Sequence, residues 1–260
     1  VVTPARKLHS LSVQDVELPK GSFSPQTPLV LSHFGIWSPL KGTDLLLEAI
    51  ALTRDPKRFR LELAGGPSKP EFETTLRDIV RAKLPKGAVT FHGRYEAERL
   101  AGHSVAGAHL FVTATRAHES FGLVLDEAIE LGLGCLVPDH GACGERAGQV
   151  DWATTFATGD ASSLATLLDQ VADNPLQVAD LRAAAARAVT DQDFTARAQG
   201  HSVMAEAMLA HLERAVELGI PQSHLKALMA EDWEEREVRL ETLNRYWDTE
   251  ASLWRGRQAR

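Results

Sequence analysis

Two glutamates, Glu119 and Glu127, stand eight positions apart around the start of a predicted helix. Glu127 falls four residues from both Leu123 and Leu131, so the three should share the face that packs on a sheet. A carboxylate on such a face is costly to bury unless hydrogen-bond donors meet it, and two adjacent ribose hydroxyls would do so. In the structural alternative, Glu119 caps the helix and Glu127 meets a backbone amide or an arginine.

The segment between the two glutamates offers an anion site. The backbone amides of Phe121, Gly122 and Leu123 lie at the predicted helix N-terminus, where N–H groups lack helical partners and the helix dipole is positive. The chain thus presents a carboxylate, an anion site and a second carboxylate. A nucleotide sugar presents the matching order of sugar hydroxyls, diphosphate and ribose hydroxyls.

An earlier loop adds positive charge. Gly35 follows an apolar run, and Lys41 stands just before another predicted helix. The glycine lets a ligand approach the backbone, and the lysine adds charge to the positive end of the helix, so together they suit a diphosphate. The alternative is a tight turn with a solvated lysine. A further loop, Gly65-Gly66, allows backbone approach but carries no reactive side chain.

An alternation of strands and helices is expected to position these loops. Apolar runs predict strands over Leu29–Phe34, Arg60–Ala64, Ala88–Phe91, His109–Thr113, Gly134–Pro138 and Ala153–Phe156. Apolar residues three and four apart predict helices over Thr43–Thr53, Glu71–Leu84, Glu96–His103 and Gly122–Leu131. Such alternation predicts an α/β fold with a doubly wound, Rossmann-like parallel sheet that binds ligands at the carboxyl ends of its strands.

The chain divides into three predicted parts. Residues 1–28 are proline-rich with few apolar runs, which indicates a linker or the start of a domain, and the initial Val1 suggests that a preceding domain is absent. Residues 29–190 form the predicted ligand-binding domain, and residues 191–260 a helical C-terminal extension. After residue 158 only helices are predicted, over Asp160–Val171, Pro175–Val189, Phe194–Leu218 and about 222–255.

The last predicted helix carries a seam of large apolar residues at seven-residue spacing: Trp233, Leu240, Trp247 and Trp254. Such a seam can bury a large aromatic area. It is expected to pack on the same domain, on the absent domain, or on a second copy of the chain in a homodimer.

Composition restricts the classes of partner. The net charge of −7 argues against non-specific binding of nucleic acid, and no apolar stretch is long enough for a transmembrane segment. The cysteines, Cys135 and Cys143, lack a metal-type spacing, which favours a reducing, cytoplasmic setting. Four histidines fall near predicted strand ends without short metal-ligand spacing and are expected to be structural, with His118 the one worth testing: His33, His92, His118 and His140.

The sequence around the two glutamates resembles a known family signature. Glu119-x7-Glu127, with Ser120-Phe121-Gly122 after the first glutamate, is similar to the E-x7-E motif of retaining GT-B glycosyltransferases of family 4. The likeness continues in order over residues 29–190, through Gly35 to Lys41-Gly42, Phe91-His92-Gly93, Glu127-Ala128 to Gly132, Cys135-Leu136-Val137, Gly141 and Glu145. Each piece is weak, but the ordered set is specific.

The resemblance implies the C-terminal, nucleotide-sugar-binding domain of a GT-B fold. Such enzymes transfer a sugar from a UDP or GDP sugar with retention, generally without a metal or other cofactor. The resemblance implies catalytic roles for Lys41 at the diphosphate and Glu119 at the sugar, and places Glu127 at the ribose. The other donor-binding positions that it implies are Gly35, Gly93, Arg94, Tyr95, Ser120, Phe121, Gly122 and Leu123, with Gly93–Tyr95 beside the base and Gly122 and Leu123 at the distal phosphate.

One position departs from the family pattern. The family commonly has an arginine where this chain has Ile36, so one cation for the diphosphate is missing unless Arg94 or Arg116 replaces it. Because the N-terminal acceptor-binding domain is expected to be absent, the chain alone should bind donor but transfer sugar poorly. The alternatives are a nucleotide-sugar epimerase or phosphorylase, or a non-catalytic module that binds a protein through the tryptophan seam. A full-length protein peripheral to a membrane stays open as well.

Overall fold

The computed structural model describes residues 16–119 and 122–190. Within these ranges one parallel sheet has the strand order β3-β2-β1-β4-β5-β6. The strands are β1 (Leu29–Trp37), β2 (Phe59–Pro67), β3 (Val89–Gly93), β4 (Leu110–Val112), β5 (Gly134–Pro138) and β6 (Ala153–Phe156). The strand order reverses between β1 and β4, which is where such sheets bind ligands. The predicted doubly wound, Rossmann-like α/β fold is confirmed.

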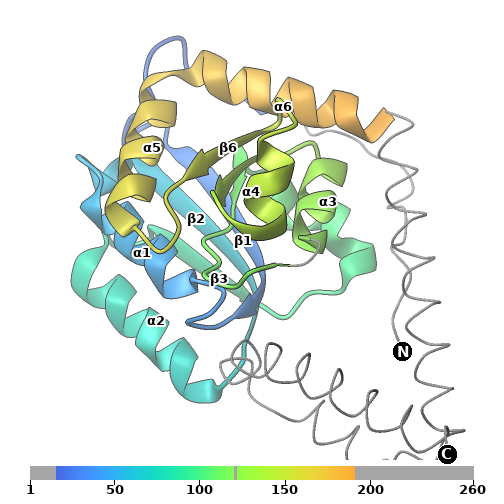
Figure 1. Ribbon diagram of the computed structural model, residues 1–260. Coiled ribbons are helices and arrows are strands. Elements are labelled where there is room, and N and C mark those ends of the chain that lie inside the picture. The colour runs from blue at the N-terminus through green and yellow to red at the C-terminus, as the bar shows by residue number, and fades with distance from the viewer. Residues whose placement is uncertain (1–15, 120–121, 191–260) are drawn as a thin grey trace, which may run out of the picture. The chain divides into compact units, whose positions relative to one another are not determined.

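Helices cover both faces of the sheet (Figure 1). They are α1 (Thr43–Leu52), α2 (Pro70–Lys83), α3 (Leu123–Glu130), α4 (Gly141–Ala147), α5 (Ala161–Asp173) and α6 (Pro175–Thr190), with short 3-10 helices η1 (Pro56–Arg58), η2 (Ala97–Gly102) and η3 (Ser104–Gly107). Alternate residues of β1 enter two separate cores: Leu31 packs with α1 and α5, whereas Phe34 packs with α3 and α6. Such a strand, apolar on both faces, is typical of a parallel sheet between helix layers.

The structure differs from the predicted elements in several places. The segment Glu96–His103, predicted as an α-helix, contains the 3-10 helix η2, and α4 was not predicted at all. Strands β1 and β2 run three residues beyond their predicted ends, because Gly35 and Gly65 pair at their carboxyl ends with positive φ angles of 130° and 137°. A Cβ on Gly65 would lie 1.8 Å from the Gly35 carbonyl oxygen, so only glycine allows this approach.

Residues 16–28, part of the predicted linker, form no helix or strand but are attached to the domain. The Phe23 side chain is buried in the core, its N–H donates to the Ala172 carbonyl at 2.8 Å, and its carbonyl accepts from Arg58 Nε at 2.8 Å. The predicted helices 194–218 and 222–255, with the tryptophan seam, lie outside the described residues. Within the described part, no helix has the length and apolar character needed to cross a bilayer.

Candidate functional site

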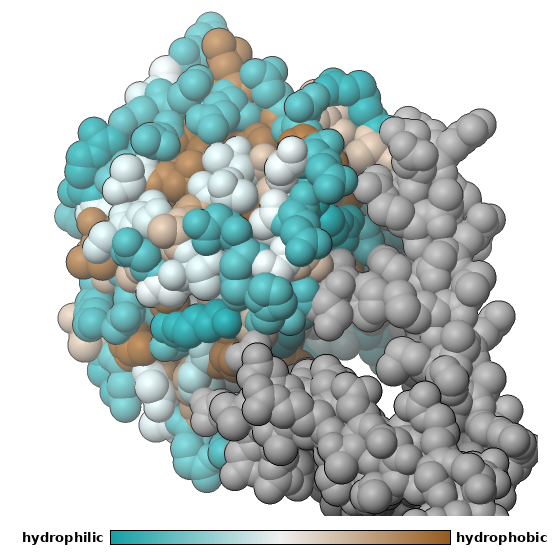
Figure 2. Space-filling model, in the orientation of Figure 1, coloured by the Kyte–Doolittle hydropathy of each residue, from teal (hydrophilic) through white to brown (hydrophobic). Residues whose placement is uncertain are grey.

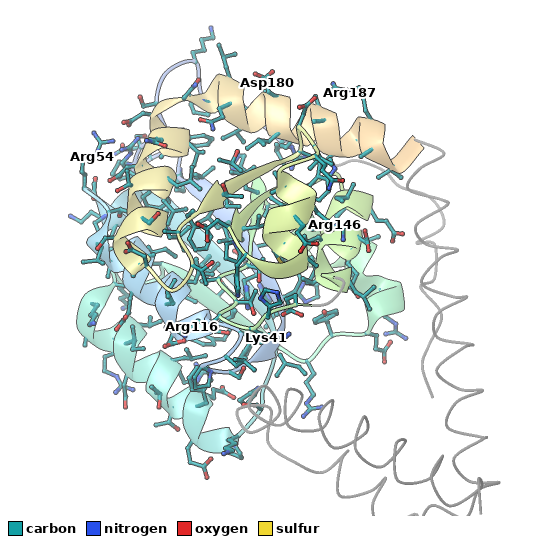
Figure 3. All side chains as sticks on the ribbon, viewed as in Figure 1. Lys41, Arg54, Arg116, Arg146, Asp180 and Arg187 are labelled. Atoms are coloured by element: carbon teal, nitrogen blue, oxygen red, sulfur yellow. The ribbon has the colours of Figure 1, made fainter. Side chains whose placement is uncertain are left out.

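Two loops meet at the carboxyl edge of the sheet, where β1 and β4 end. The β1 loop (residues 38–42) and the β4 loop (residues 113–122) are joined by the Arg116 N–H, which donates to the Leu40 carbonyl at 2.7 Å. Gly42 makes the approach possible, since a Cβ there would lie 1.8 Å from the Ala114 carbonyl oxygen. Figure 3 shows Lys41 and Arg116, one from each loop, at this edge.

This contact joins the two residues predicted to be catalytic. Lys41 Nζ lies 2.5 Å from Glu119 Oε1, and their side chains are 29% and 21% exposed. The same carboxylate oxygen accepts a hydrogen bond from Thr115 Oγ1 at 3.2 Å. Thr115 was missed in the sequence because a single hydroxyl after a strand carries no motif.

Helix α4 supports the C-terminal part of the β4 loop. The Ala142 N–H donates to the Glu119 carbonyl at 2.9 Å. Arg146 donates to the Gly122 carbonyl at 3.2 Å and pairs with Asp126 at 2.5 Å. The α4 contacts therefore fix the backbone at Glu119 and at the start of α3.

The orientation of α3 differs from the prediction. Gly122 precedes the helix in a left-handed conformation, with φ of 63°. The buried residues of the helix are Leu125, Ala128 and Ile129. Leu123 is 51% exposed, so the prediction that Leu123, Glu127 and Leu131 share the face on the sheet is wrong. Instead, the face formed by Leu125 and the residues three and four positions after it packs inward. Glu127 is half-buried at the margin of this face.

The Glu127 carboxylate is half-buried and partly desolvated. Burial, followed by the charges of Glu130 and Asp126, raises the pKa of Glu127 to about 7. Burial, and secondly the charge of Glu127, raises the pKa of Tyr95. Tyr95 therefore lies close enough to Glu127 to feel its charge, as expected for two donor-binding residues. Among the described residues, no group donates a hydrogen bond to the Glu127 side chain. Ligand hydroxyls could supply the missing donors.

The structure distinguishes the two candidates for the missing cation. Ile36 is 50% exposed. Arg116 pairs with Asp44 through two contacts of 2.9 and 3.1 Å, so its guanidinium is already engaged. Arg94 lies over Gly66, where a Cβ would be 3.2 Å from Arg94 Nε, and Gly66 is the register partner of Ile36. The geometry thus favours Arg94.

The remaining predicted positions fall at two strand ends or outside the described ranges. Gly35, two residues before the end of β1, and Gly93, the last residue of β3, have φ angles of 130° and 72°, and an added Cβ would meet no atom within 4 Å at either. Both strand ends therefore leave room beside the backbone. Ser120 and Phe121 lie outside the described residues. Over the face shown in Figure 2, hydrophobic and hydrophilic residues are intermixed.

A second polar cluster, on β2, β3 and η3, contains a serine, a histidine and a glutamate. Glu62 contacts Nε2 of His92, and Ser104 Oγ is nearer to the same nitrogen, at 3.0 Å, than to Nδ1, at 3.5 Å. A nucleophile relay needs the carboxylate on one ring nitrogen and the serine on the other, so this cluster does not form one. Nor does the described part of the chain contain three or more His, Cys, Asp or Glu residues arranged for a metal ion.

His33 is a structural histidine beneath the β1 loop. Its Nδ1–H donates to the Val112 carbonyl at 2.8 Å, which leaves Nε2 to accept from Thr43 Oγ1 at 3.5 Å. Burial lowers the pKa of His33 from 6.5 to about 4, with Lys41 contributing in the same direction. The neighbouring His118 and His140 rings meet edge to face, with centroids 5.4 Å apart.

The depressed pKa of His33 predicts an acid-dependent loss of stability. Between pH 6.5 and 4 the unfolded chain binds this proton and the folded protein does not, so the free energy of unfolding falls as the pH falls. We expect His33→Gln to remove a pH-dependent contribution of about 3 kcal/mol across this window. Urea unfolding of both proteins at pH 7 and 4.5 measures it; equal pH dependence in the two would contradict the assignment.

Comparison with known proteins agrees with this geometry. Residues 16–189 match the family described as Glycosyl transferases group 1. No match is found among curated proteins. HepE (Alr3699) from Anabaena, solved with UDP and glucose, is similar with a TM-score of 0.58 and 20% identity, over 70% of this chain and 49% of that one. The chain thus spans about half the length of HepE.

Two further solved structures are similar. The catalytic domain of cholesterol-α-glucosyltransferase from Helicobacter pylori has a TM-score of 0.50 and 16% identity, over 67% of this chain and 99% of that one. The pneumococcal O-GlcNAc transferase GtfA, in complex with UDP and GlcNAc, has a TM-score of 0.53 and 16% identity, over 75% and 38%. At these identities the structures show a shared fold. Because the family match covers more than half of its length, the chain belongs to the glycosyl transferases group 1 family.

Proposed function

We propose that this chain is the donor-binding half of a retaining glycosyltransferase of the E-x7-E type, family 4. The observation that carries the proposal is the half-buried Glu127 carboxylate, with a pKa of about 7 and no hydrogen-bond donor among the described residues. Glu127 lies in α3, eight positions after Glu119 of the Lys41–Glu119 pair. A ligand with hydroxyls at both ends and an anion between them would match these groups. Family membership supports this proposal.

Each group has a distinct proposed role. Glu127 accepts hydrogen bonds from the ribose, and Glu119 from a sugar hydroxyl near the reacting carbon. Lys41 and the amides at the start of α3 stabilise the negative charge that develops on the departing diphosphate. Since a lysine and fixed backbone dipoles supply this positive charge, we propose that transfer is metal-independent. The acceptor site is proposed to lie in another domain.

UDP sugars are the first donors to test, because HepE was solved with UDP and with UDP-glucose and GtfA with UDP. We expect UDP to stabilise the protein by about 2.7 kcal/mol at a concentration 100 times its Kd. Lys41→Met should weaken binding about tenfold or more, since hydrogen bonds to charged groups contribute roughly 1.5–3 kcal/mol. Thermal shift and calorimetry with UDP and GDP measure both.

The matched control is Lys86→Met, which removes an exposed lysine near the start of β3, away from the β1 loop. It should leave nucleotide affinity unchanged. Failure of the wild-type protein to bind either diphosphate or the corresponding sugar donors would overturn the proposal. Tight binding without donor turnover in the full protein would favour the non-catalytic module that Ile36 also allows.

A further inference from the structure

The Lys41–Glu119 ion pair joins two groups that a nucleotide sugar needs separately. Lys41 Nζ lies 2.5 Å from Glu119 Oε1. A diphosphate needs the ammonium, and a sugar hydroxyl needs the carboxylate. While the two groups are paired, each partly neutralises the other.

We propose that donor binding exchanges this pair: the diphosphate takes Lys41 from Glu119 and frees the carboxylate for the sugar. The inference rests on the proposed function. It follows that a ligand which supplies only the anion leaves Glu119 without its cation, whereas the intact donor replaces the lost partner with a hydroxyl. The exchange therefore makes the site discriminate between the donor and the nucleoside diphosphate that remains after transfer.

The energetics of the pair permit the exchange. With 29% and 21% of the side chains exposed, the pair is partly screened by water and contributes little stability. A diphosphate carries more negative charge than one carboxylate, and lysine is a compact cation with three donors on a flexible stem. Transfer of Lys41 to the diphosphate is thus favoured without a change in the fold.

Thr115 is the residue that keeps Glu119 oriented during the exchange. The residue is 1% exposed, and its Oγ1 accepts from the Ala117 N–H at 3.1 Å. The single hydroxyl hydrogen can reach the Leu40 carbonyl at 3.4 Å or Glu119 Oε1 at 3.2 Å, and the charged acceptor forms the stronger bond. Thr115 therefore acts as a positioning residue through Glu119, and it stays in place when Lys41 leaves.

The first test is the affinity for UDP alone, by calorimetry, in wild type and Glu119→Gln. Because the substitution removes the negative charge that pairs with Lys41, we expect Glu119→Gln to bind UDP about two- to fivefold more tightly, the range that partly exposed ion pairs give. It should also reduce the preference for UDP-glucose over UDP. If the wild-type protein binds GDP more tightly than UDP, then GDP and GDP-glucose are used in place of UDP and UDP-glucose.

A double-mutant cycle separates the exchange from a general effect of charge. In a Lys41→Met background the carboxylate has no ammonium to release, so Glu119→Gln should no longer tighten UDP binding. A gain that persists in that background would reflect long-range repulsion and overturn the proposal. Glu119→Ala, checked for folding by circular dichroism, repeats the test without an amide that could hold Lys41.

Thr115 is tested by the same two ligands. Thr115→Val should lower the preference for UDP-glucose over UDP while UDP affinity stays unchanged, and Thr115→Ser, which retains the hydroxyl, should keep that preference. Unchanged or weaker UDP binding in Glu119→Gln would show that the pair persists with ligand bound and would end the proposal. Failure of the proposed function is distinguishable from failure of the exchange, because the wild-type protein would then bind neither the nucleoside diphosphates nor their sugars.

Discussion

Glu127→Gln is expected to weaken UDP binding at least tenfold and, at pH 8, to increase the free energy of unfolding. The loss of affinity follows from removing a charged acceptor, since hydrogen bonds to charged groups contribute roughly 1.5–3 kcal/mol. The gain in stability follows from the pKa, which rises from 4.5 to about 7 on folding. Above pH 7 the folded protein holds a desolvated carboxylate at a cost on the order of 1–3 kcal/mol.

The sign of the pH dependence makes this prediction specific. Since folding raises the pKa, the favourable contribution of Glu127 is complete below pH 4.5 and is lost as the pH rises through 7. Urea unfolding should therefore show the variant more stable than wild type at pH 8 and similar to it at pH 4.5. Glu71→Gln, at an exposed glutamate in the first turn of α2, should leave binding unchanged and lose only the helix-dipole contribution of about 0.3–1 kcal/mol. A variant less stable than wild type at pH 8 would mean that the protein itself satisfies the carboxylate.

Gly42→Ala is expected to reduce the free energy of unfolding by about 3 kcal/mol or more. The residue has a φ of 68°, which costs an L-amino acid roughly 1–2 kcal/mol. In addition, the new Cβ would lie 1.8 Å from the Ala114 carbonyl oxygen, so the β1 and β4 loops must separate. Because these loops carry Lys41 and Glu119, UDP affinity should fall as well.

Gly87→Ala is the matched control for Gly42→Ala. Gly87 has a similar φ of 78°, but an added Cβ would meet no atom within 4 Å. Gly87→Ala should reduce the free energy of unfolding only by the cost of the left-handed backbone conformation, about 1 kcal/mol, and should leave UDP binding unchanged. Urea unfolding of the two variants isolates the close approach of the loops. Equal losses in both would indicate that the loops move apart easily.

The sequence predicted the sheet well because its strands are short apolar runs bounded by turn and loop residues. Strands β5 and β6 begin and end at the predicted residues, and the parallel topology follows from the alternation with helices. This topology also explains why Lys41 and Glu119, 78 positions apart, meet: both follow strands that end at the same edge.

The features that the sequence did not predict depend on tertiary contacts. Helix α4 has the sequence GACGERA, with two glycines and no apolar period, and its contacts with the β4 loop hold it in place. The rotation of α3 was mispredicted because LVLDEAIE carries apolar residues on more than one face. Likewise, the pairing of Arg116 with Asp44 joins residues 72 positions apart, which no local pattern indicates.

The burial of His33 has a consequence for how this protein responds to acid. His33 resists protonation on folding, whereas Glu127 gains proton affinity, and their windows overlap between about pH 4.5 and 6.5. Across that interval the His33 linkage lowers stability on acidification while the Glu127 linkage raises it, so the contributions of these two groups oppose each other. When a nucleotide binds, its ribose hydroxyls stabilise the ionised Glu127 carboxylate, so Glu127 no longer offsets the effect of His33. The liganded protein should then become the more acid-sensitive form, with His33 acting as the uncompensated sensor.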